Sequence, residues 1–234
     1  MSVKKISISN FRCFDYIDLE FSDLNNFIHG ANGSGKTSIL EALYFCSTGR
    51  SFKSSNKNLC IQNNKEAFKI QLETLSNNKI CILKESKKSI SFKINENSAT
   101  SIELFRTIPS TLLDNKTFSM FADTPKYRRK ILDRCLMASD KSYSRDFFSF
   151  HRSLKQRNAA LKFKRLSNID MWSEIFINTG TSISDKRIKF FEETKNIFFG
   201  FSKNLRDSRV LEIINSLEII FLSLIHISEP TRPS

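Results

Sequence analysis

Apolar and polar residues alternate in the first part of the chain and then give way to helical spacing. Alternation over residues 3–9 and 16–21 predicts two half-buried strands. Residues 26–29 predict a short third strand that runs directly into Gly30. Residues 38–47 predict a helix whose apolar face is made of Ile39, Leu40, Leu43, Tyr44 and Cys46. A strand, a glycine-rich turn and a helix are therefore expected in immediate succession.

The rest of the pattern separates into a strand region and a helical region. Residues 68–75, 80–84 and 90–94 predict antiparallel strands. From about residue 101 the spacing becomes helical, with Pro125 at a helix start. Two long helices, over residues 142–165 and 168–201, are expected to form an antiparallel pair.

The formal net charge of +13 changes this picture because it is unevenly distributed. Acidic and basic residues balance over residues 1–50 and over 201–234, so the whole surplus lies in residues 51–200. This segregation predicts a region that faces a polyanion beside a neutral part. The alternative is a general enrichment in lysine, since the chain is also rich in Phe, Asn and Ile.

The cysteines and the apolar segments indicate a cytoplasmic location. The five cysteines are scattered and form no CxxC pair, which argues against a disulfide framework or a zinc site. Residues 210–227 are apolar, but Glu212 and Glu218 interrupt them, so no membrane span is expected. The N-terminus does not have the pattern of a signal peptide.

Residues 30–37 read GANGSGKT and match the phosphate-binding pattern G-x-x-x-x-G-K-[ST] in full. Glycines let consecutive backbone N–H groups point inward around an anion, and the following helix adds its N-terminal dipole. Lys36 supplies positive charge for the β- and γ-phosphates, and the Thr37 hydroxyl is the expected Mg²⁺ ligand. The pattern predicts ATP as ligand, bound by Gly30, Ala31, Asn32, Gly33, Ser34, Gly35, Lys36, Thr37 and Ser38.

The flanking segments narrow the family. NFRCF at 10–14, EAL at 41–43 and TGRSFK at 48–53 accompany the phosphate loop. PKYRRKILD at 125–133, LKQRNAAL at 154–161, and Trp172, Gly180 and Arg187 follow in the same order. Together these segments resemble the RecF family of bacterial recombinational-repair ATPases, which is grouped with the ABC-type heads of SMC proteins. The resemblance covers about residues 1–200.

The resemblance implies an α/β fold: a P-loop ABC-type ATPase head, with a mixed sheet and an antiparallel β-subdomain, plus an inserted helical lobe. Residues 1–100 would form the N-terminal part of the head, 101–221 the mainly helical lobe, and 222–234 a non-native tail. That tail resembles a translated sequencing adaptor; the alternative is a genuine tail broken by Pro230 and Pro233.

The resemblance also implies a function. It is ATP-dependent DNA binding in replication, recombinational repair and SOS induction. A homodimer would close on ATP, hold single-stranded or gapped DNA, and work with other recombination-mediator proteins. Arg12 is expected to reach the nucleotide phosphates, and Arg50 and Lys53 to approach either the phosphates or DNA.

The chain departs from the family pattern in one respect. Residues 1–234 contain no Walker B segment and no signature motif, since 112–114 and 131–133 are too short and wrongly placed. We therefore expect a truncated chain with negligible hydrolysis.

Basic side chains supply the candidate DNA contacts. Residues 147–169 carry six basic side chains and no acidic one. Arg152, Lys155 and Lys162 share one helical face and are expected to lie along DNA phosphates. Arg128, Arg129 and Lys130 form a second cluster at a helix start, where cations oppose the helix dipole, and this unfavourable placement suggests contact with DNA or with a carboxylate partner. The alternative for the first group is a solvated helix face.

Two other functions remain open. A small-molecule P-loop kinase would share the phosphate loop but would not explain Arg12 or residues 156–158. A nucleotide-gated DNA-binding module without hydrolysis fits the departures noted above. Assays of phosphoryl transfer and of hydrolysis against binding separate these alternatives.

Overall fold

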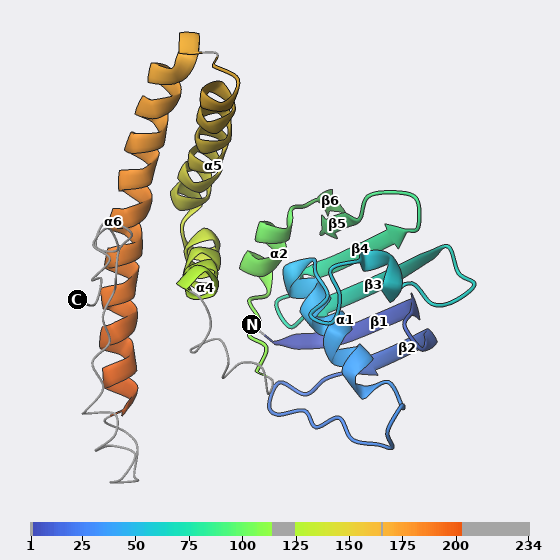
Figure 1. The fold of residues 1–234 in the computed structure, drawn as a ribbon. Coiled ribbons are helices and arrows are strands. Elements are labelled where there is room, and N and C mark those ends of the chain that lie inside the picture. The colour runs from blue at the N-terminus through green and yellow to red at the C-terminus, as the bar shows by residue number, and fades with distance from the viewer. Residues whose placement is uncertain (1, 114–124, 165, 203–234) are drawn as a thin grey trace, which may run out of the picture. The chain divides into compact units, whose positions relative to one another are not determined.

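The computed structural model describes residues 2–113, 125–164 and 166–202, and leaves out the side chains of residues 125–128, 166 and 202. It divides into two compact units, Met1–Ala122 and Asp123–Ser234 (Figure 1). The first unit contains the described strands, and the second is helical. The predicted tail at 222–234, the apolar segment at 210–227 and Asp114 lie outside the described residues.

The first unit is built on an antiparallel sheet with the order β2-β1-β3-β4-β5-β6. Ile6, Ile8, Ile70 and Ile82 are all fully buried and alternate with more exposed residues, as the period-2 pattern predicts. The strand bounds are β1 Val3–Phe11, β2 Phe14–Glu20, β3 Ala67–Thr74, β4 Lys79–Glu85, β5 Ser91–Ile94 and β6 Asn97–Ser98. The strands predicted at 3–9, 16–21, 68–75, 80–84 and 90–94 are confirmed.

Helix α1, Lys36–Thr48, packs on the sheet and completes its core (Figure 1). The ring of Phe45 from this helix makes edge-to-face contacts with Phe11 and Phe68 from the sheet, at centroid distances of 6.3 and 5.5 Å. The sequence pattern placed Leu40 on the apolar face, but its side chain is exposed, whereas Phe45 is fully buried. The sheet therefore selects a face of α1 rotated from the one that spacing alone suggested.

Two sequence predictions for this unit differ from the structure. Residues 26–29 form no strand, and Phe27 is 88% exposed. Among the described strands, both edges of β1 are already paired, with β2 and β3, so β1 offers this segment no free edge. Helix α2, Ser101–Thr107, was assigned to the helical lobe, but it packs against α1 and β5 and buries Leu104 in the sheet core.

The second unit consists of α4 Pro125–Ser139, α5 Lys141–Lys162 and α6 Ile169–Ser202. A short 3-10 turn, η2 Leu166–Asn168, precedes α6. Helices α5 and α6 lie side by side, which confirms the predicted pair (Figure 1). Leu136, Tyr143 and Ile183 form the buried centre of the bundle. None of the described helices is long and apolar enough to cross a membrane.

Candidate nucleotide-binding site

The loop before α1 has the backbone of an anion-binding nest. Gly30, Gly33 and Gly35 have φ angles of 148°, 84° and 92°, a region that side-chain-bearing residues rarely adopt. Helix α1 begins directly after this loop, and its N-cap Gly35 makes no side-chain capping hydrogen bond. The N–H group of Ser38 donates to the Gly35 carbonyl at 2.8 Å, which leaves the N–H groups of Lys36 and Thr37 for an anion at the positive end of the helix dipole.

The turn between β1 and β2 packs against this loop. A Cβ atom on Gly35 would lie 2.4 Å from Phe14 Cζ and 2.9 Å from Cys13 Sγ, so only glycine fits there. Cys13 Sγ also lies 3.9 Å from Ser38 Oγ, in the first turn of α1. Gly35 of the phosphate loop is thereby packed against residues that precede it by more than twenty positions in the sequence.

Lys36 lies across the loop. Its Nζ donates hydrogen bonds to the carbonyl oxygens of Gly30, at 2.8 Å, and Ala31, at 2.7 Å. The ammonium is thus held at the rim of the nest by two neutral acceptors, which a phosphate oxygen can outcompete because it is charged. Thr37 is exposed beside it on the first turn of α1. No group of three or more His, Cys, Asp or Glu residues that could hold a metal ion occurs in the described part of the chain.

Arg12 is held by a partner that sequence reasoning missed. Its Nε donates to Glu41 Oε2 at 3.0 Å and its Nη2 to Glu41 Oε1 at 2.6 Å, while Nη1 donates to the Leu59 carbonyl at 2.7 Å. Glu41 is fully buried, on the same helix as Lys36. One signal was available: a carboxylate within an otherwise apolar helix face is costly unless a cation pairs with it.

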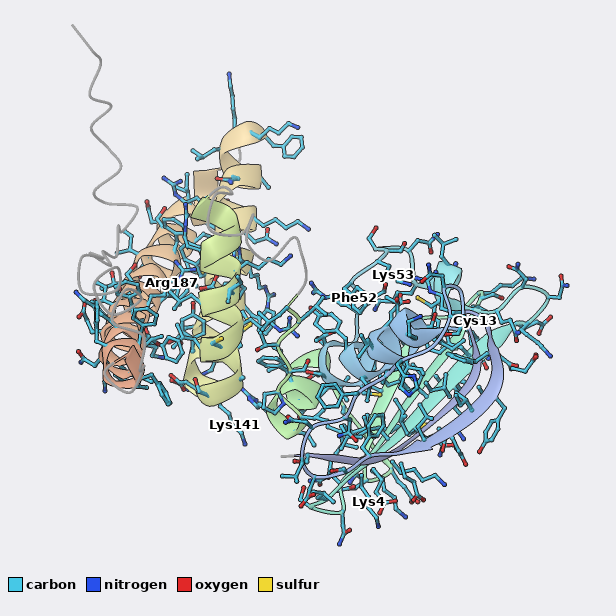
Figure 2. All side chains as sticks on the ribbon, turned by 90° about the horizontal axis from the view of Figure 1, so that it is seen from below. Lys4, Cys13, Phe52, Lys53, Lys141 and Arg187 are labelled. Carbon is cyan, nitrogen blue, oxygen red and sulfur yellow. The ribbon has the colours of Figure 1, made fainter. Side chains whose placement is uncertain are left out.

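Glu41 also orders the loop after α1. Ser51 Oγ donates to Glu41 Oε1 and accepts from the N–H groups of Lys53, at 2.9 Å, and Ser54, at 3.0 Å. Burial by itself would raise the pKa of Glu41, but the hydrogen bonds from Arg12 and Ser51 outweigh it and hold the pKa below its ordinary value. Figure 2 shows Cys13, Phe52 and Lys53 on the unit that carries α1.

The candidate DNA-contacting residues lie in the other unit. Arg152, Lys155 and Lys162 are all exposed on α5, whereas Ser153 is buried. Lys162 Nζ lies 5.7 Å from the ring centroid of Phe163, which is itself 65% exposed. The structure thus leaves the predicted basic face open to solvent, but it adds an aromatic side chain that the pattern did not single out.

The second predicted cluster, at the start of α4, differs from this open face. Arg129 is only partly exposed and already has an interaction within the chain. The side chain of Arg128 lies outside the described residues.

A second buried arginine–carboxylate pair joins the three helices of this unit. Arg187 Nε donates to Asp133 Oδ1 at 2.7 Å and Nη2 to Asp133 Oδ2 at 2.9 Å. The Tyr143 hydroxyl donates to Asp133 Oδ1 at 2.6 Å. Asp133, which ends the apolar segment at 131–133, is thus bonded within the helical unit.

Comparison with known proteins agrees with the geometry of the loop. A family model described as an AAA domain matches residues 5–224. The chain is 33% identical over 229 residues to the DNA replication and repair protein RecF of Pseudoalteromonas translucida, covering 94% of this chain and 61% of that relative. The RecF protein of Vibrio campbellii is 32% identical over 84% of this chain and 57% of its own length.

Comparison with solved structures also finds similarity to RecF. The structure titled as the recombination mediator protein RecF-ATP in the RecFOR pathway superposes with a TM-score of 0.77 at 27% identity. The superposition covers 83% of this chain and 55% of the chain in the RecF-ATP structure. The chain therefore spans about three fifths of the length of the curated relatives it matches.

Proposed function

Because the chain belongs to the AAA-domain family and is a homologue of RecF over most of its length, we propose that it binds ATP and acts in DNA replication and repair. The observation that carries this proposal is the position of Lys36, whose ammonium lies on the carbonyls of Gly30 and Ala31 at the start of α1. Backbone N–H groups, a helix N-terminus and a mobile cation converge there, which is the donor set that a polyphosphate requires.

Each residue of the loop has a distinct part in this proposal. The N–H groups of the loop surround the β-phosphate, and Lys36 exchanges its two carbonyl acceptors for phosphate oxygens. The Thr37 hydroxyl would ligate Mg²⁺, and the ion would supply charge that neutralises the phosphates. Arg12 adds a second cation from the β1–β2 turn.

Substitution of Lys36 by alanine tests nucleotide binding. Removing a charge-assisted contact to phosphate costs about 1.5–3 kcal/mol, so affinity for a fluorescent ATP analogue should fall roughly tenfold to more than a hundredfold. Lys69→Ala, which removes an exposed lysine from β3 of the same unit, is the matched control and should bind as the unmodified chain does. Equal affinity in Lys36→Ala would exclude the loop as the site.

We further propose that the exposed face of α5 binds DNA, single-stranded or gapped. Arg152, Lys155 and Lys162 supply charge for phosphates, and no acidic residue interrupts residues 147–169. Phe163 at the end of this face favours a single strand, because unpaired bases stack on exposed aromatic rings. The ATP-closed homodimer, contacts with other recombination mediators, the role in SOS induction and the cytoplasmic location belong to this proposal as well.

A second candidate is a nucleotide-gated DNA-binding module without hydrolysis. It is favoured by the lack of a Walker B segment and a signature motif in residues 1–234, because phosphoryl transfer needs a carboxylate that holds Mg²⁺ and a group that orients water. We expect this polypeptide to bind ATP and to release phosphate no faster than its Lys36→Ala variant. Turnover clearly above that variant would favour hydrolysis by these residues.

A further inference from the structure

Glu41 lies at the centre of a small polar network inside an apolar helix face. Its side chain is fully buried. It accepts hydrogen bonds from Arg12, from Ser51 and, at 3.8 Å, from Cys60 Sγ. A buried carboxylate is costly unless its oxygens are satisfied, and here each oxygen has at least one donor. The network therefore fixes its members as well as neutralising the charge.

The hydrogen bonds of Arg12 show that the network fixes the orientation of its guanidinium. Three of the five N–H groups of a guanidinium are used by Glu41 and the Leu59 carbonyl, which leaves two that these bonds do not use. The side chain keeps 21% of its surface exposed. The forked pair with Glu41 sets the plane of the guanidinium and so holds the side chain in one orientation.

The backbone of Arg12 is constrained in the same place. Its φ of 54° is uncommon for a residue with a side chain, and its N–H donates to the Cys60 carbonyl at 2.9 Å. The two residues that follow it, Cys13 and Phe14, are those that pack against Gly35 of the phosphate loop. The base of the Arg12 side chain and the floor of the phosphate loop are thus parts of one turn.

We infer that Glu41 is a positioning residue for nucleotide binding: its carboxylate sets the Arg12 guanidinium so that the two unused N–H groups meet the phosphates held by the loop. This inference rests on the proposed ATP-binding function and deepens it. Glu41 itself touches no phosphate. It stands on α1, which begins at the phosphate loop, and it removes the orientational freedom that Arg12 would otherwise lose on binding.

The test is a double-mutant cycle on ATP affinity in the full 234-residue chain. Glu41→Gln keeps the shape of the side chain but cannot hold the fork, because an amide presents only one acceptor oxygen. We expect Glu41→Gln and Arg12→Ala each to weaken ATP binding about tenfold, the effect of one charge-assisted contact. In the Arg12→Ala background, Glu41→Gln should add less than about twofold, because the two residues act as one unit.

Two further variants keep the inference falsifiable if Glu41→Gln folds poorly. Arg12→Lys leaves the buried carboxylate paired with a cation but lacks the planar fork, and it should lose affinity about as much as Arg12→Ala. Glu73→Gln alters a partly exposed carboxylate that pairs with Lys4 on the sheet, and this variant should bind ATP normally. Thermal unfolding of each variant separates loss of fold from loss of affinity.

The outcomes are distinguishable. Normal ATP affinity in Arg12→Lys, or additive losses in the cycle, would overturn the positioning role and leave ATP binding itself intact. Unchanged affinity in Glu41→Gln alongside a lower melting temperature would show a purely structural pair. If the unmodified chain does not bind ATP, or Lys36→Ala binds as well as it does, the failure lies in the proposed function.

Discussion

The two units of this chain each bury one forked arginine–carboxylate pair, and the pairs serve different ends. Arg12 and Glu41 tie a turn and two loops to the helix that starts at the phosphate loop. Arg187 and Asp133 tie α6 to α4, and Tyr143 adds α5 to the same point. The first pair therefore adjoins the candidate ligand site, whereas the second one holds helices in register.

The surroundings explain this difference. Asp133 lies on α4 and takes its partners from two other regular helices, α5 and α6. The three helices pack around Leu136 and Ile183, so every donor is already fixed by helix packing. Burial, followed by the hydrogen bond to Asp133, raises the pKa of Tyr143, whose hydroxyl donates to Asp133. Around Glu41 the partners come from segments outside the regular helices and strands, namely the β1–β2 turn and the loop after α1. The same kind of arginine–carboxylate pair therefore holds helices in register in one unit and positions loops in the other.

The largest expected effect comes from breaking the helical pair. Arg187→Ala leaves the buried Asp133 carboxylate without its cation, and removing one partner of a buried pair costs about 3–5 kcal/mol. Urea unfolding followed by circular dichroism should show this loss, with ATP affinity unchanged. The double variant Arg187→Met, Asp133→Leu should recover most of the stability. An equal loss of ATP affinity in Arg187→Ala would contradict the separation of roles.

The next largest effect is expected from removing positive charge from the exposed face of α5. Replacing Arg152, Lys155 and Lys162 together by glutamine should weaken binding to a single-stranded oligonucleotide. The slope of log K against log [salt] should also become less steep by about 2, since each lost phosphate contact contributes about 0.7. Replacing Phe163 by alanine should lower affinity and leave that slope unchanged, because stacking releases no counterions. A flat salt response in the unmodified chain would exclude the basic face.

A smaller effect follows from removing the neutral member of the helical network. Tyr143→Phe deletes one hydrogen bond to Asp133, while Arg187 still occupies both carboxylate oxygens. The free energy of unfolding should fall by about 0.5–1.5 kcal/mol. Tyr16→Phe, at an exposed position on β2, is the control and should be neutral. A loss as large as that of Arg187→Ala would mean that the hydroxyl, and not the ion pair, holds the helices.

The smallest effect is the pH dependence of the Glu41 pair. The pKa of Glu41 is lowered in the folded chain, so its contribution to stability is present above the unfolded value of about 4.3 and is lost as pH falls through the folded value. Denaturation of the unmodified chain should therefore become easier below about pH 4. In the Glu41→Gln variant, this part of the loss of folding stability at low pH should be absent. Identical acid profiles in the two chains would show that the folded pKa of Glu41 is not lowered.

The sequence by itself determined the elements whose signals are local. Alternation around Ile6 and Ile70 requires only a half-buried strand, and it predicted β1 and β3 correctly. The spacing after Pro125 and over the two long helices likewise depends on contacts within a few turns. The phosphate loop belongs to this class, because its glycines and Lys36 act through the backbone of one continuous segment.

Only the tertiary structure decided how distant segments meet. Arg12 and Glu41 are 29 residues apart, and Asp133 and Arg187 are 54 residues apart, so no periodic pattern links them. Residues 26–29 have the composition of a strand but pair with none of the described strands. The face of α1 that is buried was likewise set by the aromatic residues of the sheet. Pairing, burial and strand formation depend on partners that lie elsewhere in the chain. A local sequence pattern contains no information about which distant residues those partners are.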